Sequence, residues 1–142
     1  MSIPKLGPAP VTRRVFGHLI AALGAWSAAP TPSIAKVEHD IPLIETFVAG
    51  TRYYEAAAAI GSLQPGTPLV LRRQPQNPHD DLAIEVFAPN GFKLGYVPRS
   101  HNTALAALAD AGKRLASEVT SVDSFEPDEW APHIGIVVSL RD

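Results

Sequence analysis

The chain contains no cysteine among its 142 residues. It therefore has neither a disulfide framework nor a thiolate metal site, and any zinc site would have to use histidine and carboxylate ligands. No G-x-x-x-x-G-K-[ST] motif is present, which excludes a P-loop ATPase motor. The length is typical of one domain, and the sequence has no internal repeat and no low-complexity segment.

Acidic residues are missing from the first 37 positions, where four basic residues occur. The whole chain has a net charge of −2, but without residues 1–35 it would carry nine basic and fourteen acidic residues, a net charge of −5. A net acidic domain is a poor non-specific DNA binder, because contacts to phosphates supply that affinity. A local pocket that binds the end of a nucleic acid remains compatible with this charge.

The first 35 residues contain the three parts of an export signal in the right order. Thr12–Phe16 (TRRVF) resembles a twin-arginine motif, and Ser33–Ala35 has small residues at the positions that a signal peptidase requires. The apolar run between them, Val15–Ala29, is too short for a comfortable membrane span. We therefore expect residues 1–35 to be a Tat-type signal peptide and the protein to be periplasmic or secreted.

Two alternatives to the signal peptide stay open. In the first alternative, the start codon is misassigned, Val37 is the true first residue and the protein is cytoplasmic. In the second, the apolar run forms a buried or amphipathic N-terminal helix.

Short strands separated by turn residues are predicted from residue 36 to the end of the chain. The clearest is Leu82–Phe87 (LAIEVF), in which apolar and polar residues alternate. Pro65-Gly66 and Pro89-Asn90-Gly91 predict turns. The other predicted strands are Leu43–Ala49, Pro68–Arg73, Phe92–Val97, Leu115–Val122 and Ile134–Leu140.

One clear helix is predicted over residues 101–111, with Ser100 as its N-cap and Gly112 after its end. Its apolar face consists of Ala104, Leu105, Leu108 and Ala111. A further helical turn is predicted over Ala56–Ile60. Six strands with tight turns and one or two short helices indicate a mainly β (α+β) domain over residues 36–142, which we expect to be a small OB-like or SH3-like β-barrel.

The densest group of polar side chains lies in RRQPQNPHDD, residues 72–81, between two predicted strands. Asn77 and Asp80 belong to residue types that hold turns through side-chain hydrogen bonds to the backbone. Alternatively, they form a polar pocket at the mouth of the barrel, where a carboxylate accepts a hydrogen bond from a hydroxyl and His79 offers a flat ring for stacking. Arg72 and Arg73 are interpreted as a solvated strand end, since an isolated basic pair contributes little.

The segment Gly50–Tyr54 (GTRYY) presents the same choice between a structural and a binding role. If Tyr53 and Tyr54 alternate on a strand, one is buried and the other exposed. An exposed tyrosine beside Arg52 is a platform for a base or a sugar. A half-buried tyrosine with a hydrogen-bonded hydroxyl is the commoner arrangement.

The dipeptide His39-Asp40 and the run His79-Asp80-Asp81 are the only groupings that suggest a metal-dependent hydrolase. Adjacent residues of a strand point to opposite faces, so such neighbours seldom bind one metal together. A catalytic zinc also requires three protein ligands. We therefore expect no catalytic residue, metal or cofactor.

Three motifs at matched spacing resemble the HIRAN domain family. They are G-x-R-Y-Y at Gly50–Tyr54, L-x-L-x-R-x-P-x-N-P-x-D-x-x-A-I-x-V at Leu69–Val86, and G-x-x-x-G-Y-V-P-R at Gly91–Arg99. The resemblance spans residues 45–140, and N-P-x-D-x-x-A-I is its most specific part. It implies an OB-like β-barrel with flanking helices. In eukaryotic DNA-repair remodellers, such domains precede a helicase motor and bind the free 3′ end of single-stranded DNA. The resemblance therefore implies the same ligand for this chain.

The resemblance also implies roles for individual residues by position. Arg52 and Tyr53 match a pair that contacts the terminal nucleotides. Asp80 matches a carboxylate that accepts a hydrogen bond from the 3′-hydroxyl group. Arg99 matches a basic residue near a phosphate.

Three further positions carry implied roles, and two positions, His79 and Gln76, depart from the family pattern. Asn77 holds the turn and reaches the ligand backbone. His79 stands where the family often has a stacking tyrosine, and it stacks less well. Trp130 matches an aromatic residue that covers the terminal base, and Gln76 replaces a residue that is often asparagine.

The sequence therefore predicts a non-enzymatic module that binds single-stranded DNA at its 3′-OH end. The alternative is an exported accessory or interaction domain that keeps the barrel without DNA binding and has an unknown extracytoplasmic partner. The leader and the net acidic charge favour this alternative. A metal-dependent hydrolase is a third and weaker hypothesis.

Overall fold

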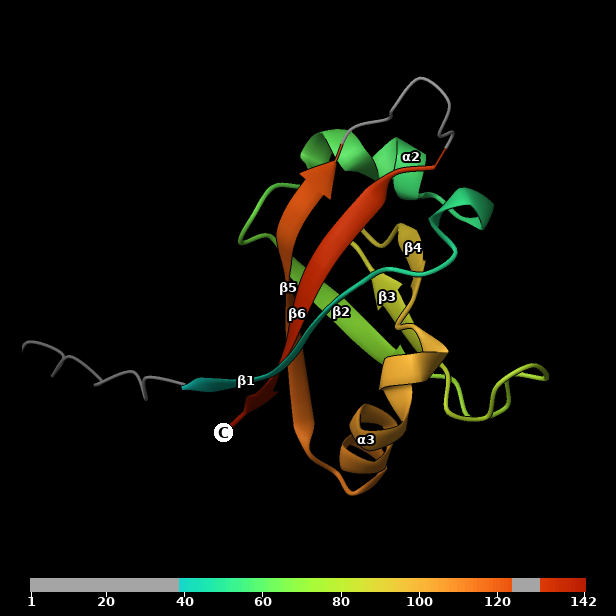
Figure 1. Cartoon of the computed structure of the whole chain (residues 1–142), viewed down its shortest axis with the longest axis vertical. Helices are drawn as coiled ribbons and strands as arrows, with labels where there is room; N and C mark the ends of the chain where they lie inside the picture. The colour runs from blue at the N-terminus through green and yellow to red at the C-terminus, as the bar shows by residue number, and fades with distance from the viewer. Residues whose placement is uncertain (1–38, 124–130) are drawn as a thin grey trace, which may run out of the picture. The chain divides into compact units, whose positions relative to one another are not determined.

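Six antiparallel strands form one sheet in the computed structural model, which describes residues 39–123 and 131–142. Their order in the sheet is β1-β6-β5-β2-β3-β4 (Figure 1). The predicted number of strands is confirmed; β2 has the predicted bounds and the others shift by one to three residues. The strands are β1 (Asp40–Phe47), β2 (Pro68–Arg73), β3 (Ile84–Phe87), β4 (Lys93–Tyr96), β5 (Arg114–Asp123) and β6 (His133–Arg141).

The two edges of the sheet, β1 and β4, are joined by one bridge, between Ala49, which follows β1, and Tyr96 of β4. The amide nitrogen of Ala49 donates to the carbonyl oxygen of Tyr96 at 2.7 Å, and the amide of Tyr96 donates back at 3.0 Å. Gly95 makes this approach possible, because a Cβ atom there would lie 2.2 Å from the carbonyl oxygen of Ala49. The sheet thus curls into an OB-like barrel joined by one bridge rather than a continuous ladder, and the mainly β class is confirmed.

The core lies on the inner face of this curled sheet. Ile84 and Val86 of β3 are buried there, as the alternation of the third predicted strand requires, and Leu82 packs partly buried against them. Each large apolar side chain so buried stabilises the fold by about 1.5–3 kcal/mol. Other large apolar side chains that are almost completely buried are Leu94, Val119, Ile134, Ile136 and Val138.

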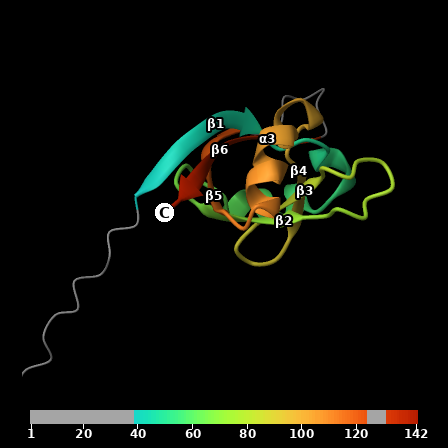
Figure 2. The ribbon, with the colours of Figure 1, turned by 90° about the horizontal axis from the view of Figure 1, so that it is seen from below.

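Helix α3 (Arg99–Asp110) lies across one end of the barrel (Figure 2). It begins directly after its N-cap Pro98, so the prediction of Ser100 as N-cap was wrong, and Ser100 sits in the first turn. Of the predicted apolar face, Leu105 is buried, whereas Ala104 and Ala111 are exposed. The buried face also includes Ala106 and Asn102, whose side chain donates to Asp80. A polar residue of this kind is invisible to a search for apolar periodicity.

Three short helical segments connect β1 to β2, namely η1 (Thr51–Tyr53), α2 (Ala56–Ala59) and η2 (Ile60–Ser62). The helical turn predicted at Ala56 is confirmed, and Ala56 and Ala59 are fully buried. The assumption that Tyr53 and Tyr54 alternate on a strand was wrong. In η1 the buried residue is Thr51, whose hydroxyl donates to the carbonyl oxygen of Pro132 at 2.9 Å, and both tyrosines are exposed.

The predicted leader and Trp130 lie outside the described residues, so their predictions stay predictions. Within residues 39–123 and 131–142, no helix is long and apolar enough to cross a membrane.

Candidate nucleic-acid end-binding site

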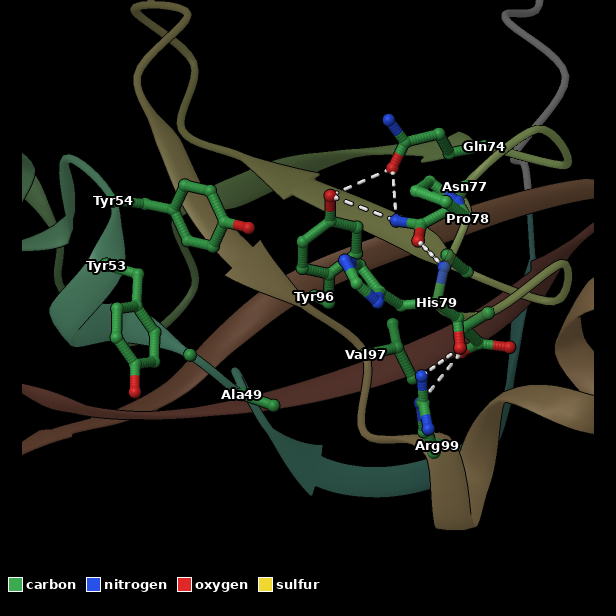
Figure 3. A pocket seen from close by; sticks show the side chains of 13 residues that line it. Ala49, Tyr53, Tyr54, Gln74, Asn77, Pro78, His79, Tyr96, Val97 and Arg99 are labelled. Atoms are coloured by element: carbon green, nitrogen blue, oxygen red, sulfur yellow. Dashed lines mark hydrogen bonds and ion pairs between the residues drawn. The ribbon is translucent and has the colours of Figure 1, made fainter.

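A cavity of about 500 Å³ opens at the place where the barrel is joined by the Ala49–Tyr96 bridge. Figure 3 shows Tyr53 and Tyr54 on one side of it, Asn77 and His79 on the other, and Tyr96 between them. We call Tyr53, Tyr54 and Tyr96 the aromatic wall. We call the lining part of the connection between β2 and β3, residues 74–83, the loop wall.

Asn77 holds the loop wall in shape with every polar atom of its side chain. Its Oδ1 accepts a hydrogen bond from the amide of His79 at 2.9 Å, which is the turn-holding role expected of asparagine. Its Nδ2 donates to Gln74 Oε1 at 2.9 Å and to the hydroxyl of Tyr96 at 3.4 Å. Asn77 therefore joins the loop wall to the aromatic wall.

Asp80 fixes the same loop to helix α3. Its Oδ1 accepts from the amide of Leu82 at 3.0 Å, and its Oδ2 accepts from Nδ2 of the buried Asn102 at 2.8 Å. Arg99 lies alongside, with Nε 3.7 Å from Oδ2. Each carboxylate oxygen can accept more than one hydrogen bond, so Asp80 combines a structural role with remaining acceptor capacity at the edge of the cavity.

Arg99 and His79 form the outer edge of the loop wall. Arg99 is the first residue of α3, and its guanidinium group donates to the carbonyl oxygen of His79. Its side chain is 67% exposed, and the His79 side chain is exposed as well. Because the protein itself does not bury them, both side chains are accessible to a ligand that enters the cavity.

The aromatic wall begins in the η1 turn. Gly50 precedes this turn with φ of +78°, a left-handed conformation that favours glycine. Tyr53 is 68% exposed, and the guanidinium carbon of Arg52 lies 4.6 Å from the centre of its ring. Arg52 itself does not line the cavity; it supports the ring that does.

A buried ion pair lies behind the aromatic wall. Tyr54 and Tyr96 meet edge to face, with ring centres 5.6 Å apart. The Lys93 ammonium lies within 4.4 Å of both ring centres and donates to the Tyr96 hydroxyl at 2.8 Å. It also donates to Glu85, which is 3% exposed, at 3.0 Å. On the other side of Glu85, Nε of Arg72 donates to it at 2.7 Å.

The pKa values of this cluster follow from burial and pairing. Burial alone would raise the pKa of Glu85, but hydrogen bonds from Arg72 and Lys93 outweigh it, so the pKa lies below its ordinary value. Burial would lower the pKa of Lys93, but hydrogen bonds with Tyr96 and Glu85 raise it. Burial is the main reason why the pKa of the Tyr54 phenol is raised. All charged groups of the cluster are therefore in their ionised forms near neutral pH.

Of the seven predicted site residues, the structure brings five to this cavity: Tyr53, Asn77, His79, Asp80 and Arg99. Sequence reasoning assigned no role to Gln74 and Tyr96, whose side chains meet at 2.8 Å. Tyr96 carried a signal in the sequence, because it belongs to the motif Gly91–Arg99 and follows the predicted Pro89-Asn90-Gly91 turn. Residues that pair across neighbouring antiparallel strands share a face, and Tyr96 pairs with Glu85 in this way. Gln74 follows the end of β2 and carried no such signal.

A second hollow of about 430 Å³ lies on the other side of residues 77–82, between this loop and the start of α3. It shares five lining residues with the first cavity, namely Asn77, Pro78, His79, Asp80 and Arg99. In the described part of the chain, no three His, Cys, Asp or Glu side chains are grouped so that they could hold a metal ion.

Comparison with families and solved structures identifies the family and agrees with the fold. The family model of the HIRAN domain matches residues 41–132. A crystal structure of a protein from Lactobacillus plantarum is similar to the chain, with 30% sequence identity and a TM-score of 0.66. The alignment covers 74% of this chain and 98% of that one.

Two structures of HLTF HIRAN domains have the same fold. The crystal structure of the HIRAN domain of human HLTF has 23% identity and a TM-score of 0.55. The NMR structure of the HLTF HIRAN domain in its DNA-bound conformation has 22% identity and a TM-score of 0.50. Each alignment covers 72% of this chain and 78% of the HLTF one. No curated protein sequence matches the chain.

Proposed function

The chain belongs to the HIRAN domain family, and we propose that it is a non-enzymatic module that binds the 3′-hydroxyl end of single-stranded DNA. The observation that carries this proposal is the cavity itself. It gathers exposed aromatic rings, a carboxylate and an arginine from three segments that are distant in sequence. That the HLTF HIRAN domain has been solved in a DNA-bound conformation supports DNA as the ligand class.

Each wall has a distinct task in this proposal. The terminal base stacks on the exposed ring of Tyr53, and His79 faces it from the loop wall, because aromatic faces accept any base. The terminal hydroxyl donates to the free acceptor capacity of Asp80. Arg99 forms a charge-assisted hydrogen bond with the preceding phosphate. The net acidic charge of the domain restricts binding to this cavity and disfavours non-specific contacts along DNA.

The test is fluorescence anisotropy of the purified full-length chain with labelled single-stranded oligonucleotides of one sequence at fixed salt. One oligonucleotide ends in a 3′-hydroxyl and the other in a 3′-phosphate. We expect the 3′-phosphate to weaken binding by about 10-fold to 100-fold, since it removes a hydrogen bond to a charged group and places a second anion beside Asp80.

Asp80→Asn provides the matched variant, because it keeps the size of the side chain and an oxygen for the amide of Leu82. We expect its preference for the 3′-hydroxyl over the 3′-phosphate to fall toward unity. If the role of Asp80 is purely structural, Asp80→Asn should weaken the binding of both oligonucleotides equally and leave the preference unchanged. Equal binding of both ends by the unchanged protein would overturn the end-recognition proposal.

The second candidate is an accessory domain outside the cytoplasm that keeps the barrel without binding DNA. The net charge of −5 that remains without residues 1–35 favours it. Absence of binding to either oligonucleotide would support this candidate. Mass spectrometry of the protein recovered from its native host would test the export step, because cleavage by signal peptidase leaves Lys36 as the new N-terminus.

A further inference from the structure

We propose that the outer face of β2 and β3 binds the nucleotide that precedes the terminal one, through a strip formed by Val70, Arg72 and Phe87. This inference rests on the proposed function, because the strip is useful only to a polymer whose end lies in the cavity. The occupant to which we commit is therefore the upstream part of the same single-stranded DNA.

Strand register places the strip directly beside the aromatic wall. Arg72 pairs with Glu85, which pairs with Tyr96, so these side chains share one face of the sheet. Val70 pairs with Phe87 in the same way, in the neighbouring row. Two strand spacings separate the backbone of Arg72 from that of Tyr96, which is about 10 Å. The strip thus lies on the same face of the sheet as Tyr96, which lines the cavity.

Arg72 has the geometry of a phosphate-binding arginine. Its Nε is held by Glu85 at 2.7 Å, and its guanidinium carbon lies 4.7 Å from the centre of the Phe87 ring. Among the described residues it makes hydrogen bonds only through Nε, which leaves the Nη groups to face solvent on a side chain that is 65% exposed. A guanidinium fixed in this way presents its remaining donors with little loss of side-chain entropy.

Charge and apolar surface both suit a nucleotide. The cluster carries two cations, Arg72 and Lys93, against the single carboxylate of Glu85, so it is locally positive in a chain whose net charge is −2. Val70 is 56% exposed although it is a large apolar residue in a strand. An exposed apolar side chain beside an arginine–aromatic pair gives a base a surface on which to stack.

The experiment measures affinity against oligonucleotide length, with a free 3′-hydroxyl throughout. The full-length chain should bind longer oligonucleotides better, and Arg72→Gln should lose about tenfold of the affinity for them, as expected for one stacked or phosphate-contacted nucleotide. The slope of log affinity against log salt concentration should also decrease by about one for this variant, because one phosphate contact is lost. Arg72→Gln should leave the preference for the 3′-hydroxyl over the 3′-phosphate unchanged.

Two further variants guard against indirect effects. Arg72→Lys keeps a cation for Glu85 but has no second donor arm, so it should fold normally and still lose most of the length dependence. Arg114→Gln removes one positive charge from β5 at a distance from both hollows, and it should bind like the unchanged protein.

Failure of this inference can be told apart from failure of the proposed function. Binding that needs a free 3′-hydroxyl but is the same for Arg72→Gln and Arg114→Gln at every length would overturn the strip alone. Absence of any binding by the unchanged protein would overturn both.

Discussion

The two walls of the cavity differ in how far the protein itself uses their side chains. On the loop wall, the protein forms hydrogen bonds with every polar atom of the Asn77 side chain and with both carboxylate oxygens of Asp80. On the aromatic wall, by contrast, Tyr53 is 68% exposed. The loop wall owes its shape to satisfied polar groups, so its residues are structural and ligand-facing at once. Tyr53 of the aromatic wall presents surface that the fold does not need, whereas Tyr54 and Tyr96 also pack against Lys93. Substitutions in the two walls should therefore separate stability from binding.

The largest expected effect comes from the junction on which both walls depend. At Gly95 φ is +154°, and a Cβ atom would clash with the carbonyl oxygen of Ala49. Gly95→Ala should lower the free energy of unfolding by about 3 kcal/mol or more, since backbone strain and overpacking add. Urea denaturation followed by circular dichroism measures the change.

Gly61→Ala is the matched control for this substitution. Gly61 lies in η2 without a positive φ, and a Cβ atom there would meet nothing within 4 Å. Its free energy of unfolding should change by less than about 1 kcal/mol. Equal stability of the two variants would show that the Ala49–Tyr96 bridge is not essential for the barrel.

Loss of the buried carboxylate behind the aromatic wall should have the next largest effect. Glu85→Gln should destabilise the protein by about 2 kcal/mol at pH 7, below the range for a fully buried pair because Arg72 remains exposed to water. Glu118→Gln, at an exposed position of strand β5, is the control and should change stability by less than about 0.5 kcal/mol.

The pH dependence of this effect has a definite sign. The pKa of Glu85 is lower in the folded protein than its ordinary value of 4.5, so the unfolded chain takes up a proton first as the pH falls. The stabilisation by ionised Glu85 is therefore complete above pH 4.5 and is lost as the pH falls through the folded pKa. The difference in the free energy of unfolding between the protein and Glu85→Gln should be constant down to about pH 4.5 and shrink as the pH falls further. A difference that stays constant at lower pH would contradict the assignment.

A third substitution weakens the loop wall from behind. Arg73 donates to both carboxylate oxygens of Asp110 at 2.9 and 3.0 Å and to the carbonyl oxygens of Ala83 and Asp81 at 2.8 and 3.0 Å. It thereby ties the ends of β2, the site loop and α3 together. Arg73→Ala should cost about 1.5–2 kcal/mol and also weaken DNA binding, because Asn77 and Asp80 lose their support.

Arg141→Ala is the control for Arg73. Arg141 also makes a two-point pair, with Asp40 at 3.1 and 3.0 Å, but both side chains are substantially exposed. Such a surface pair contributes at most about 1 kcal/mol. Melting curves and anisotropy are measured for both variants. If Arg73→Ala and Arg141→Ala lose a similarly small amount of stability and of DNA affinity, Arg73 forms only a surface ion pair and does not hold the loop wall in place.

The sequence predicted the features that depend on neighbours along the chain and missed those that depend on register. Strand positions and the turn-holding Asn77 and Asp80 are local and were found. The interpretation of Arg73 as a solvated strand end was wrong, because its partner Asp110 is distant in sequence. The Glu85–Lys93 pair and the position of Tyr96 follow from the pairing of β3 with β4. The turn at Pro89-Asn90-Gly91 predicts that these strands pair but does not give their register, which has an irregularity between Val86 and Phe87.

The smallest effect on stability should come from the aromatic wall itself. Tyr53→Ala should change the free energy of unfolding by less than about 0.5 kcal/mol, because the ring is exposed and contacts chiefly Arg52. The same variant should lose about 1–3 kcal/mol of DNA-binding free energy, as is usual for a stacked base. Tyr53→Phe keeps the ring and should retain both properties. If instead Tyr53→Ala binds DNA normally, base stacking must depend on His79 or Tyr54, and the two walls would not be separable in this way.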